Sequence, residues 1–281
     1  MLIFLRLKRA AVHSLLAGLL TLTLWWASCT PPIGAGPLMP GFERIRIVHY
    51  NAFGPATRTD ADFARWLRDV DPDIAVLVDA PWGYSAAHAW LRERYPHRIE
   101  PEPGRAWPYI ILSRWPLEDA AVAPYSEATQ FSFVARRSVV VSAPGGARFL
   151  ITAMNPASPR SPSDWRLALS VVRRDGPLLR EWRQRTGLPM IVAGDFNSAP
   201  TGRAHKTFAR ESGLVGWSPV AGAGTWPSWL PPWLSLPIDR FFSSPDVRLK
   251  TLGIGPRFRS DHRAIVGEFD VPVVPGPPPE R

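Results

Sequence analysis

Short apolar runs recur along this chain, and polar or turn-forming residues separate them. Runs of this length that are rich in Val, Ile and Leu are typical of buried strands. We therefore predict strands over six segments, which are Arg46–Tyr50, Ile74–Val78, Ile110–Leu112, Val139–Val141, Phe149–Ala153 and Met190–Ala193. A further apolar run at Leu249–Ile254 has the same character.

Two longer stretches place apolar residues at the three- and four-residue spacing of a helix. We predict helices over Asp60–Val70 and Trp165–Trp182. Proline lacks the amide hydrogen that a helix interior needs, so we expect the second helix to kink or restart at Gly176 and Pro177. Strands that alternate with helices in this way are typical of a layered α/β protein.

One large domain is expected to account for most of the 281 residues. We predict a signal peptide or membrane anchor at 1–29, a Pro/Gly-rich tether at 30–43, the domain at 44–271 and a disordered tail at 272–281. About 240 residues is within the size of a single α/β unit. With 46% hydrophobic residues the chain can bury a sizeable core, and it has no repeat of fixed period.

The amino terminus has the layout of an export signal. Arg6, Lys8 and Arg9 precede an apolar stretch at Ala10–Ser28. A helix over this stretch would span about 28 Å, close to the hydrocarbon thickness of a bilayer, so an uncleaved anchor fits as well. Cys29 follows directly and resembles the acylated cysteine of bacterial lipoproteins. A cleaved signal, an anchor and a lipoprotein therefore all remain open.

Each of these routes places the domain outside the cytoplasm, because positive charges ahead of an apolar stretch stay on the cytoplasmic side. Cys29 is the only cysteine, so the domain itself can form no disulfide. We expect a protein of the bacterial cell envelope that contacts the membrane through its amino terminus. The sequence carries no signal for an oligomeric state.

Two short polar strings stand out because they lie far apart and each follows an apolar run. The first is Gly194-Asp195-Phe196-Asn197, and the second is Ser260-Asp261-His262. An isolated Asp-x-Asn is typical of a turn, since both side chains bond the local backbone. Polar groups just beyond strand ends can instead converge on one ligand, and the two strings together favour that interpretation.

With four further segments these strings resemble the endonuclease/exonuclease/phosphatase superfamily over residues 44 to 270. The segments, in chain order, are Ile45–Asn51, Pro72–Asp79, Tyr109–Pro116 and Pro237–Phe242. The resemblance implies an α/β fold of the four-layer sandwich type, in which two packed β-sheets are flanked by helices. It also implies a metal-dependent phosphodiesterase or phosphatase that hydrolyses a phosphate ester.

The resemblance implies a role for each residue of the two strings. Asp195 would orient and deprotonate the attacking water, and Asn197 would hold the phosphate or the water beside it. His262 would contact the phosphoryl oxygens and stabilise the transition state. Asp239 would bond the other ring nitrogen of His262 and so fix its tautomer and orientation.

The resemblance further implies a divalent cation held by Asp79 and Asp261, with Asn51 nearby. Oxygen ligands of this kind suit Mg²⁺ or Mn²⁺. Asn155 and Tyr109 complete the expected catalytic set. Two positions depart from the family pattern: Asp79 stands where Glu is usual, and Asn155 stands where many members have His.

The composition admits several phosphate-bearing partners. Without the three leader charges the net charge falls from +9 to +6, which attracts nucleic acid and acidic lipid headgroups alike. Three tryptophans between Trp226 and Trp233 could line a substrate cleft, stack on a base or sugar, enter a lipid interface, or pack on the domain. Nucleic acid, phospholipid and small phosphoesters all remain candidate substrates.

Three functions remain open at this stage. The first is an active metal-dependent phosphoesterase on the outer face of the cytoplasmic membrane. The second is an impaired relative that binds a phosphate-bearing ligand or a membrane surface without turnover, which Asp79 and Asn155 favour. The third is an interaction module in which the tryptophan segment is the functional part.

Overall fold

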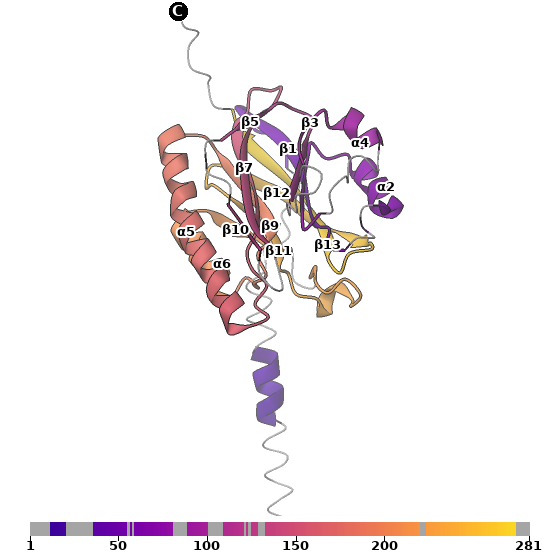
Figure 1. Ribbon diagram of the computed structural model, residues 1–281, viewed down its shortest axis with the longest axis vertical. Coiled ribbons are helices and arrows are strands. Elements are labelled where there is room, and N and C mark those ends of the chain that lie inside the picture. Colours follow the sequence, from indigo (N-terminus) through magenta and orange to yellow (C-terminus); the bar gives the residue numbers. More distant parts are fainter. Residues whose placement is uncertain are drawn as a thin grey trace, which may run out of the picture.

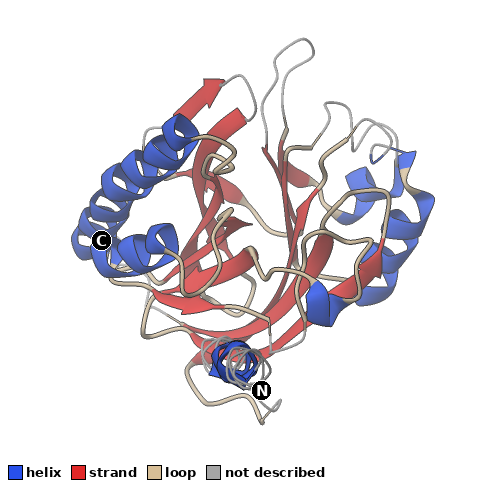
Figure 2. Ribbon diagram, turned by 90° about the horizontal axis from the view of Figure 1, so that it is seen from below, coloured by secondary structure: helices blue, strands red, loops and turns tan. Residues whose placement is uncertain are grey.

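The structure is a computed structural model, and it describes residues 12–20, 36–54, 57, 59–80, 89–100, 109–120, 122, 125–128, 133–219 and 223–273. Two β-sheets form the centre of the domain, and helices lie outside them (Figures 1 and 2). Residues 12–20 are helical. Within the described ranges, no helix combines the length and the hydropathy needed to cross a membrane.

The first sheet contains six strands in the order β12-β13-β1-β2-β4-β3. Strands β1 and β2 are parallel, and the other neighbours pair antiparallel. The bounds are β1 Phe42–Asn51, β2 Ile74–Val78, β3 His97–Ile99, β4 Tyr109–Ser113, β12 Arg248–Arg257 and β13 Arg263–Pro272.

The second sheet contains seven strands in the order β10-β11-β9-β8-β7-β5, with β6 paired to β7. Here β8 and β9 are the parallel pair. The bounds are β5 Leu117–Asp119, β6 Tyr125–Ala128, β7 Phe133–Ser142, β8 Arg148–Asn155, β9 Met190–Asp195, β10 Val215–Trp217 and β11 Asp239–Ser243. All six predicted strands are confirmed, and Leu249–Ile254 lies within β12.

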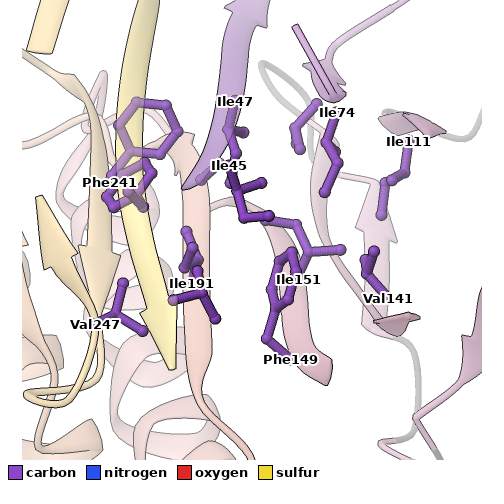
Figure 3. Close-up of a cluster of buried hydrophobic side chains, with 14 of the residues drawn as sticks. Ile45, Ile47, Ile74, Ile111, Val141, Phe149, Ile151, Ile191, Phe241 and Val247 are labelled. Carbon is purple, nitrogen blue, oxygen red and sulfur yellow. The ribbon is translucent and has the colours of Figure 1, made fainter. Parts of the chain in front are cut away.

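Three apolar clusters hold four layers together, so the predicted four-layer sandwich is confirmed. The central cluster lies between the sheets and includes Ile45, Ile74, Ile151, Ile191 and Phe241 (Figure 3). The other two lie under the helices on the outer faces (Figure 2). These helices are α2 Ala61–Val70 and α4 Ala89–Arg94 on the first sheet, and α5 Pro162–Thr186 and α6 Arg203–Ser212 on the second, with a short 3-10 turn, η2, at Pro232–Leu234.

Helix α5 continues through Pro177, so the expected restart is wrong. Its buried face packs on the second sheet on both sides of the proline, through Val172 and Leu179. Gly176 lies against α6, where an added Cβ would stand 2.6 Å from the Cβ of Glu211. Tertiary packing therefore outweighs the one backbone hydrogen bond that proline removes.

The sheet reaches slightly beyond the predicted domain, because Phe42 pairs with Pro272 where β1 begins and β13 ends. The first strand thus starts two residues before position 44, and the last ends one residue after 271. Residues 1–11 and 21–35, which include Cys29, and the tail from 274 onward lie outside the described residues.

We expect Gly194→Ala to lower the free energy of unfolding by about 3 kcal/mol. The added Cβ would stand 2.0 Å from the backbone oxygen of Met154, so the parallel pairing of β8 and β9 would have to open. Urea unfolding of both proteins measures the loss. Gly253→Ala is the matched control, because its Cβ would meet only Val266, at 3.5 Å; equal stability changes in the two variants would contradict the prediction.

Candidate active site

Polar side chains from both sheets meet at one end of the sandwich. In the first sheet, the parallel strands β1 and β2 end side by side, since Asn51 pairs with Val78. This places Asn51 next to Asp79, which directly follows β2. Strand β13 runs antiparallel to β1, so its start lies at the same end and brings His262 there.

The second sheet contributes through the same geometry. Strands β8 and β9 are parallel, with Met154 opposite Gly194, so Asn155 and Asp195 lie at their adjacent ends. Strand β11 runs antiparallel to β9, and its first residue, Asp239, faces Asp195. Six strand ends that are distant in sequence therefore present polar groups to one place.

Two histidines hold Asp239, which is fully buried. His262 Nδ1 lies 2.8 Å from one carboxylate oxygen, and His49 Nε2 lies 3.1 Å from the other. Nδ1 of His49 faces the carbonyl of Val76 at 3.2 Å. The Nε2 atom of His262 is thereby directed into the site, where it lies 3.7 Å from Asp195 Oδ2. The expected positioning of His262 by Asp239 agrees with this arrangement.

Two asparagines link the remaining acids. Asn51 Nδ2 donates to Asp195 Oδ2 at 3.0 Å and to Asp79 Oδ2 at 3.2 Å. Asn155 Nδ2 donates to the other oxygen of Asp79 at 2.8 Å. The backbone N–H of Asn197 donates to Asp195 Oδ1 at 2.8 Å, while its side-chain Nδ2 donates to the carbonyl oxygen of Pro156. Both oxygens of Asp195 and both oxygens of Asp79 therefore accept a hydrogen bond.

The segment that contains the tryptophans is fastened to Asp261. Trp226 Nε1 donates to Asp261 Oδ2 at 2.9 Å, and the amide of Ser228 donates to its backbone oxygen at 2.7 Å. Of the three tryptophans only Trp226 packs inward, since Trp229 and Trp233 are 56% and 67% exposed. The segment therefore forms a wall of the site and also presents two rings to solvent.

Burial dominates the electrostatics of the acids. It raises the pKa of Asp195 to about 7, because His262 only partly offsets the desolvation and the repulsion from Asp239. Burial likewise raises the pKa of Asp79 to about 6, against the hydrogen bond from Asn155 and the charge of His262. The ionised forms of both acids are thus costly in this buried site, and an added positive charge would stabilise them.

His262 and Asp239 shift in the directions of an ion pair. Burial alone would lower the pKa of His262, but the charges of Asp239 and Asp195 raise it to about 9. Burial opposes ionisation of Asp239 as well, yet the charge of His262 and the hydrogen bonds from His262 and His49 hold its pKa below the ordinary range. At neutral pH the pair is an imidazolium and a carboxylate.

The donor atoms fit a divalent cation. Asp195, Asp239 and His262 each place a possible ligand atom within 4.8 Å of the others. Both oxygens of Asp239 are already bonded to histidines, so the hydrogen-bond pattern favours other acids as ligands. Asp261 Oδ1 is buried and has no hydrogen-bond partner in the described part of the chain. It is an oxygen of the kind that Mg²⁺ or Mn²⁺ binds.

The backbone is strained at two of the site positions. Asp79 has φ 50° and Asn197 has φ 47°, both in the left-handed region that side chains with a Cβ rarely adopt. Asp and Asn tolerate this region better than most residues, and such strain is concentrated at functional sites. Asp79 directly follows β2, and Asn197 stands two residues after the end of β9, so both positions lie in the turns that leave these strands.

The structure brings eight of the nine predicted site residues together, and the ninth, Tyr109, lies on the strand beside β2 at the same end of the sheet. Tyr109 opens β4 opposite Val78, but it packs in the apolar core between the sheets, and Arg137 and Arg136 supply the charges that act on its hydroxyl. Burial raises its pKa to about 12.

Sequence reasoning missed His49 as a member of the site and left the lining of a cleft as one of several roles for the segment that contains Trp226. His49 lies two residues before Asn51 on the same face of β1, and a polar residue within a buried strand was the available signal. Trp226 gave no local signal, because its contact with Asp261 joins residues 35 apart in the chain.

Comparison with known proteins agrees with this geometry. The model of the Endonuclease/Exonuclease/phosphatase family matches residues 48–262. The chain belongs to this family. The match starts within β1 and ends at His262, so it includes every strand end that contributes to the site.

Solved structures from the endonuclease/exonuclease/phosphatase family share the fold. A family member from Beutenbergia cavernae is 20% identical, with a TM-score of 0.59, over 82% of this chain and 72% of its own. The mannosyl-6-phosphatase Bt3783 of Bacteroides thetaiotaomicron is 15% identical, with a TM-score of 0.61, over 80% and 99%. A truncated TDP2 of Caenorhabditis elegans is 19% identical, with a TM-score of 0.59, over 81% and 98%. No curated protein matches the chain by sequence.

Proposed function

We propose that this chain is a metal-dependent phosphodiesterase of the endonuclease/exonuclease/phosphatase family, exported from the cytoplasm or anchored to the membrane. One observation carries the activity: a buried carboxylate, Asp195, lies 3.7 Å from the Nε2 atom of an imidazolium that Asp239 holds in place. A base and a fixed positive charge this close together can act on the same phosphate, the base on the attacking water and the positive charge on a phosphoryl oxygen.

The roles of the residues follow from their positions. Asp195 accepts the proton of the attacking water, since its raised pKa of about 7 suits a base at neutral pH. His262 directs a positive N–H at the phosphoryl oxygens and stabilises their charge. Asp239 and His49 orient His262, and Asn197 offers its amide group beside the phosphate.

Asp79 and Asp261 would hold a Mg²⁺ or Mn²⁺ ion, with Asn51 ordering Asp79 through its hydrogen bond. Such an ion supplies charge stabilisation at the phosphoryl oxygens and polarises a bound water. The observation that supports the ion is that burial raises the pKa values of Asp79 and Asp195. Their negative charges therefore lack enough positive charge nearby. A divalent cation would neutralise those negative charges.

The two departures from the family pattern are accommodated locally. Asn155 donates to Asp79 at 2.8 Å, so it positions the shorter carboxylate where a longer one is usual. An amide can also donate to a phosphate oxygen, although it cannot transfer a proton. These contacts support an active enzyme over a relative that only binds its ligand.

Export is proposed from the leader alone. Arg6, Lys8 and Arg9 ahead of an apolar stretch favour translocation of the domain to the outer side of the cytoplasmic membrane. Carbonate extraction of membranes tests the attachment, and protease added to spheroplasts tests the side on which the domain lies. A protein that stays inaccessible to protease in spheroplasts would contradict export.

Turnover of bis(p-nitrophenyl) phosphate by the full chain, in Mg²⁺, in Mn²⁺ and in chelator, tests the activity. We expect hydrolysis that requires the metal and disappears in Asp195→Ala. A folded protein that binds Mn²⁺ yet cleaves neither this diester, nor DNA, nor a phospholipid would support the impaired binder in its place.

We expect Trp226→Phe to weaken Mn²⁺ binding about tenfold while the fold is retained. The change removes the N–H that fixes Asp261, and loss of such a supporting hydrogen bond typically costs 10 to 100-fold in metal affinity. Calorimetric titration with Mn²⁺ measures it. Trp233→Phe is the control, since Trp233 is exposed and lies away from Asp261; equal losses in both variants would refute the role of Trp226.

A further inference from the structure

A cavity of about 570 Å³ adjoins the active site on the side of Asp261. We call it the side cleft, and it is lined by Ser228, Trp229, Arg257, Arg259 and Asp261 together with Asp60, Asp62, Phe258 and Ser260. Its volume is within the range of small-molecule sites. Because it shares Asp261 with the proposed metal centre, a ligand in the side cleft would be continuous with a phosphate at His262.

Two arginines give the side cleft an available positive charge. Arg257 and Arg259 are both exposed, and neither guanidinium forms an ion pair or hydrogen bond in the described part of the chain. The acids nearby are occupied: Asp62 pairs with Arg65 at 2.9 Å, and Asp60 accepts three backbone amides. An incoming anion would therefore meet two guanidinium groups whose planar forks suit phosphate oxygens.

The backbone that carries these arginines is held in place. Phe258 lies between them and is 8% exposed, with its ring edge-on to Phe63 at 5.2 Å. The amide of Arg259 donates to Asp60 at 2.7 Å. The two guanidinium groups thus project from a fixed segment, which limits the entropy lost when they bind a ligand.

Trp229 adds an aromatic surface to the side cleft. Trp229 is 56% exposed, and its ring stands edge-on to Trp226 with centroids 6.5 Å apart. Trp226 and Ser228 are bonded to Asp261 and Ser260, so the segment cannot move independently of the metal centre. An exposed indole in a fixed position is a surface on which a planar base can stack.

We propose that the side cleft is the nucleotide subsite of this enzyme: a nucleobase stacks on Trp229, and the phosphate next to the one being cleaved lies between Arg257 and Arg259. The proposal rests on the phosphodiesterase function above and adds its substrate class, a single-stranded nucleic acid or dinucleotide. A phosphate followed by a base is the ligand that uses both the arginines and Trp229.

Binding of thymidine dinucleotides to the full chain tests the proposal, with Asp195→Asn present in every protein to prevent turnover. The probes are TpT and its 5′- and 3′-phosphorylated forms, and calorimetry gives each dissociation constant. We expect Arg257→Gln with Arg259→Gln to weaken the better phosphorylated probe about tenfold and TpT less than twofold. For the phosphorylated probe, the slope of log affinity against log salt concentration should become shallower by about 0.7 in the double variant, because one phosphate contact is lost.

Trp229→Leu should weaken all three dinucleotides about tenfold. The controls are Trp233→Leu and Arg210→Gln, which alter an exposed ring and an exposed guanidinium outside the side cleft. Equal affinities in all variants would overturn the proposal. An effect of the arginines without one of Trp229 would overturn the nucleobase assignment and indicate a second phosphate from another source, such as a lipid headgroup.

The two proposals fail separately. Hydrolysis of bis(p-nitrophenyl) phosphate, which has no base and no second phosphate, measures the catalytic centre alone. Turnover of that diester with unaltered dinucleotide binding in the variants would remove the nucleotide subsite and keep the enzyme. Dinucleotide binding that depends on Trp229, without turnover of any diester, would keep the nucleotide subsite and exclude the enzyme activity.

Discussion

Asp195→Asn should lower kcat by about 10³-fold and should gain stability relative to the wild type as the pH rises. Asparagine has the shape of aspartate but cannot accept the proton of the attacking water, and general-base catalysis contributes 10² to 10⁴-fold. The stability of the variant follows from burial, which raises the pKa of Asp195 to about 7 and thus makes its charged form costly. Turnover of an aryl diester and urea unfolding measure the two effects.

The pH dependence gives this prediction a second readout. A carboxyl whose folded pKa lies above its unfolded value of 3.8 stabilises the fold fully below pH 3.8, and that contribution is lost as the pH rises through 7. In chelator, Asp195→Asn should therefore gain stability over the wild type between pH 5 and pH 8. Asp246→Asn, which alters a partly exposed acid paired with Arg183, is the control. A variant that keeps more than a tenth of wild-type kcat would exclude Asp195 as the base.

Asp239→Asn should lower kcat about 10³-fold and move the alkaline limit of activity toward neutral pH. The carboxylate accepts from His262 and His49, and an amide offers only one acceptor oxygen to the two rings. Without the negative charge the pKa of His262 falls from about 9, so the imidazolium is lost at a lower pH. Loss of the orienting acid in a comparable Asp-His pair costs about 10⁴-fold in serine proteases.

The pKa shifts of His262 and Asp239 also set how the free energy of unfolding depends on pH, and Asp239→Asn alters that dependence. The pKa of His262 is raised on folding, so its contribution is complete below pH 6.5 and is lost as the pH rises through 9. The pKa of Asp239 is lowered, so its contribution is present above 3.8 and is lost as the pH falls through the folded value. Removing the charge should cost about 3 kcal/mol near pH 6, because one buried partner remains charged and unpaired.

Profiles of kcat against pH for the wild type, Asp239→Asn and His49→Gln test this role. His49→Gln leaves the bond between Asp239 and His262 in place, so its alkaline limit should stay near that of the wild type. An unshifted limit in Asp239→Asn would show that another group controls the high-pH side.

Much of the fold could be predicted from local patterns. The predicted strands are confirmed because a strand buried on both faces is largely apolar, and three to five such residues in a row are visible without any partner. The sequence did not predict that α5 continues through Pro177 without a restart, because the reason is not local. Its continuity depends on contacts of α5 with the second sheet and with Glu211 of α6, which no window of the sequence contains.

The sequence by itself determined the family, the two sheets and most of the acidic and amide groups of the site, because each of these lies within a few residues of a recognisable strand end. Only the tertiary structure decided which groups bond to each other. His49 meets Asp239 across 190 residues, and Trp226 fixes Asp261 from a separate segment. It also brought Trp229, Arg257 and Arg259 to one cleft. Such contacts follow from how the strands pair and the sheets stack, which long-range packing sets and local composition does not.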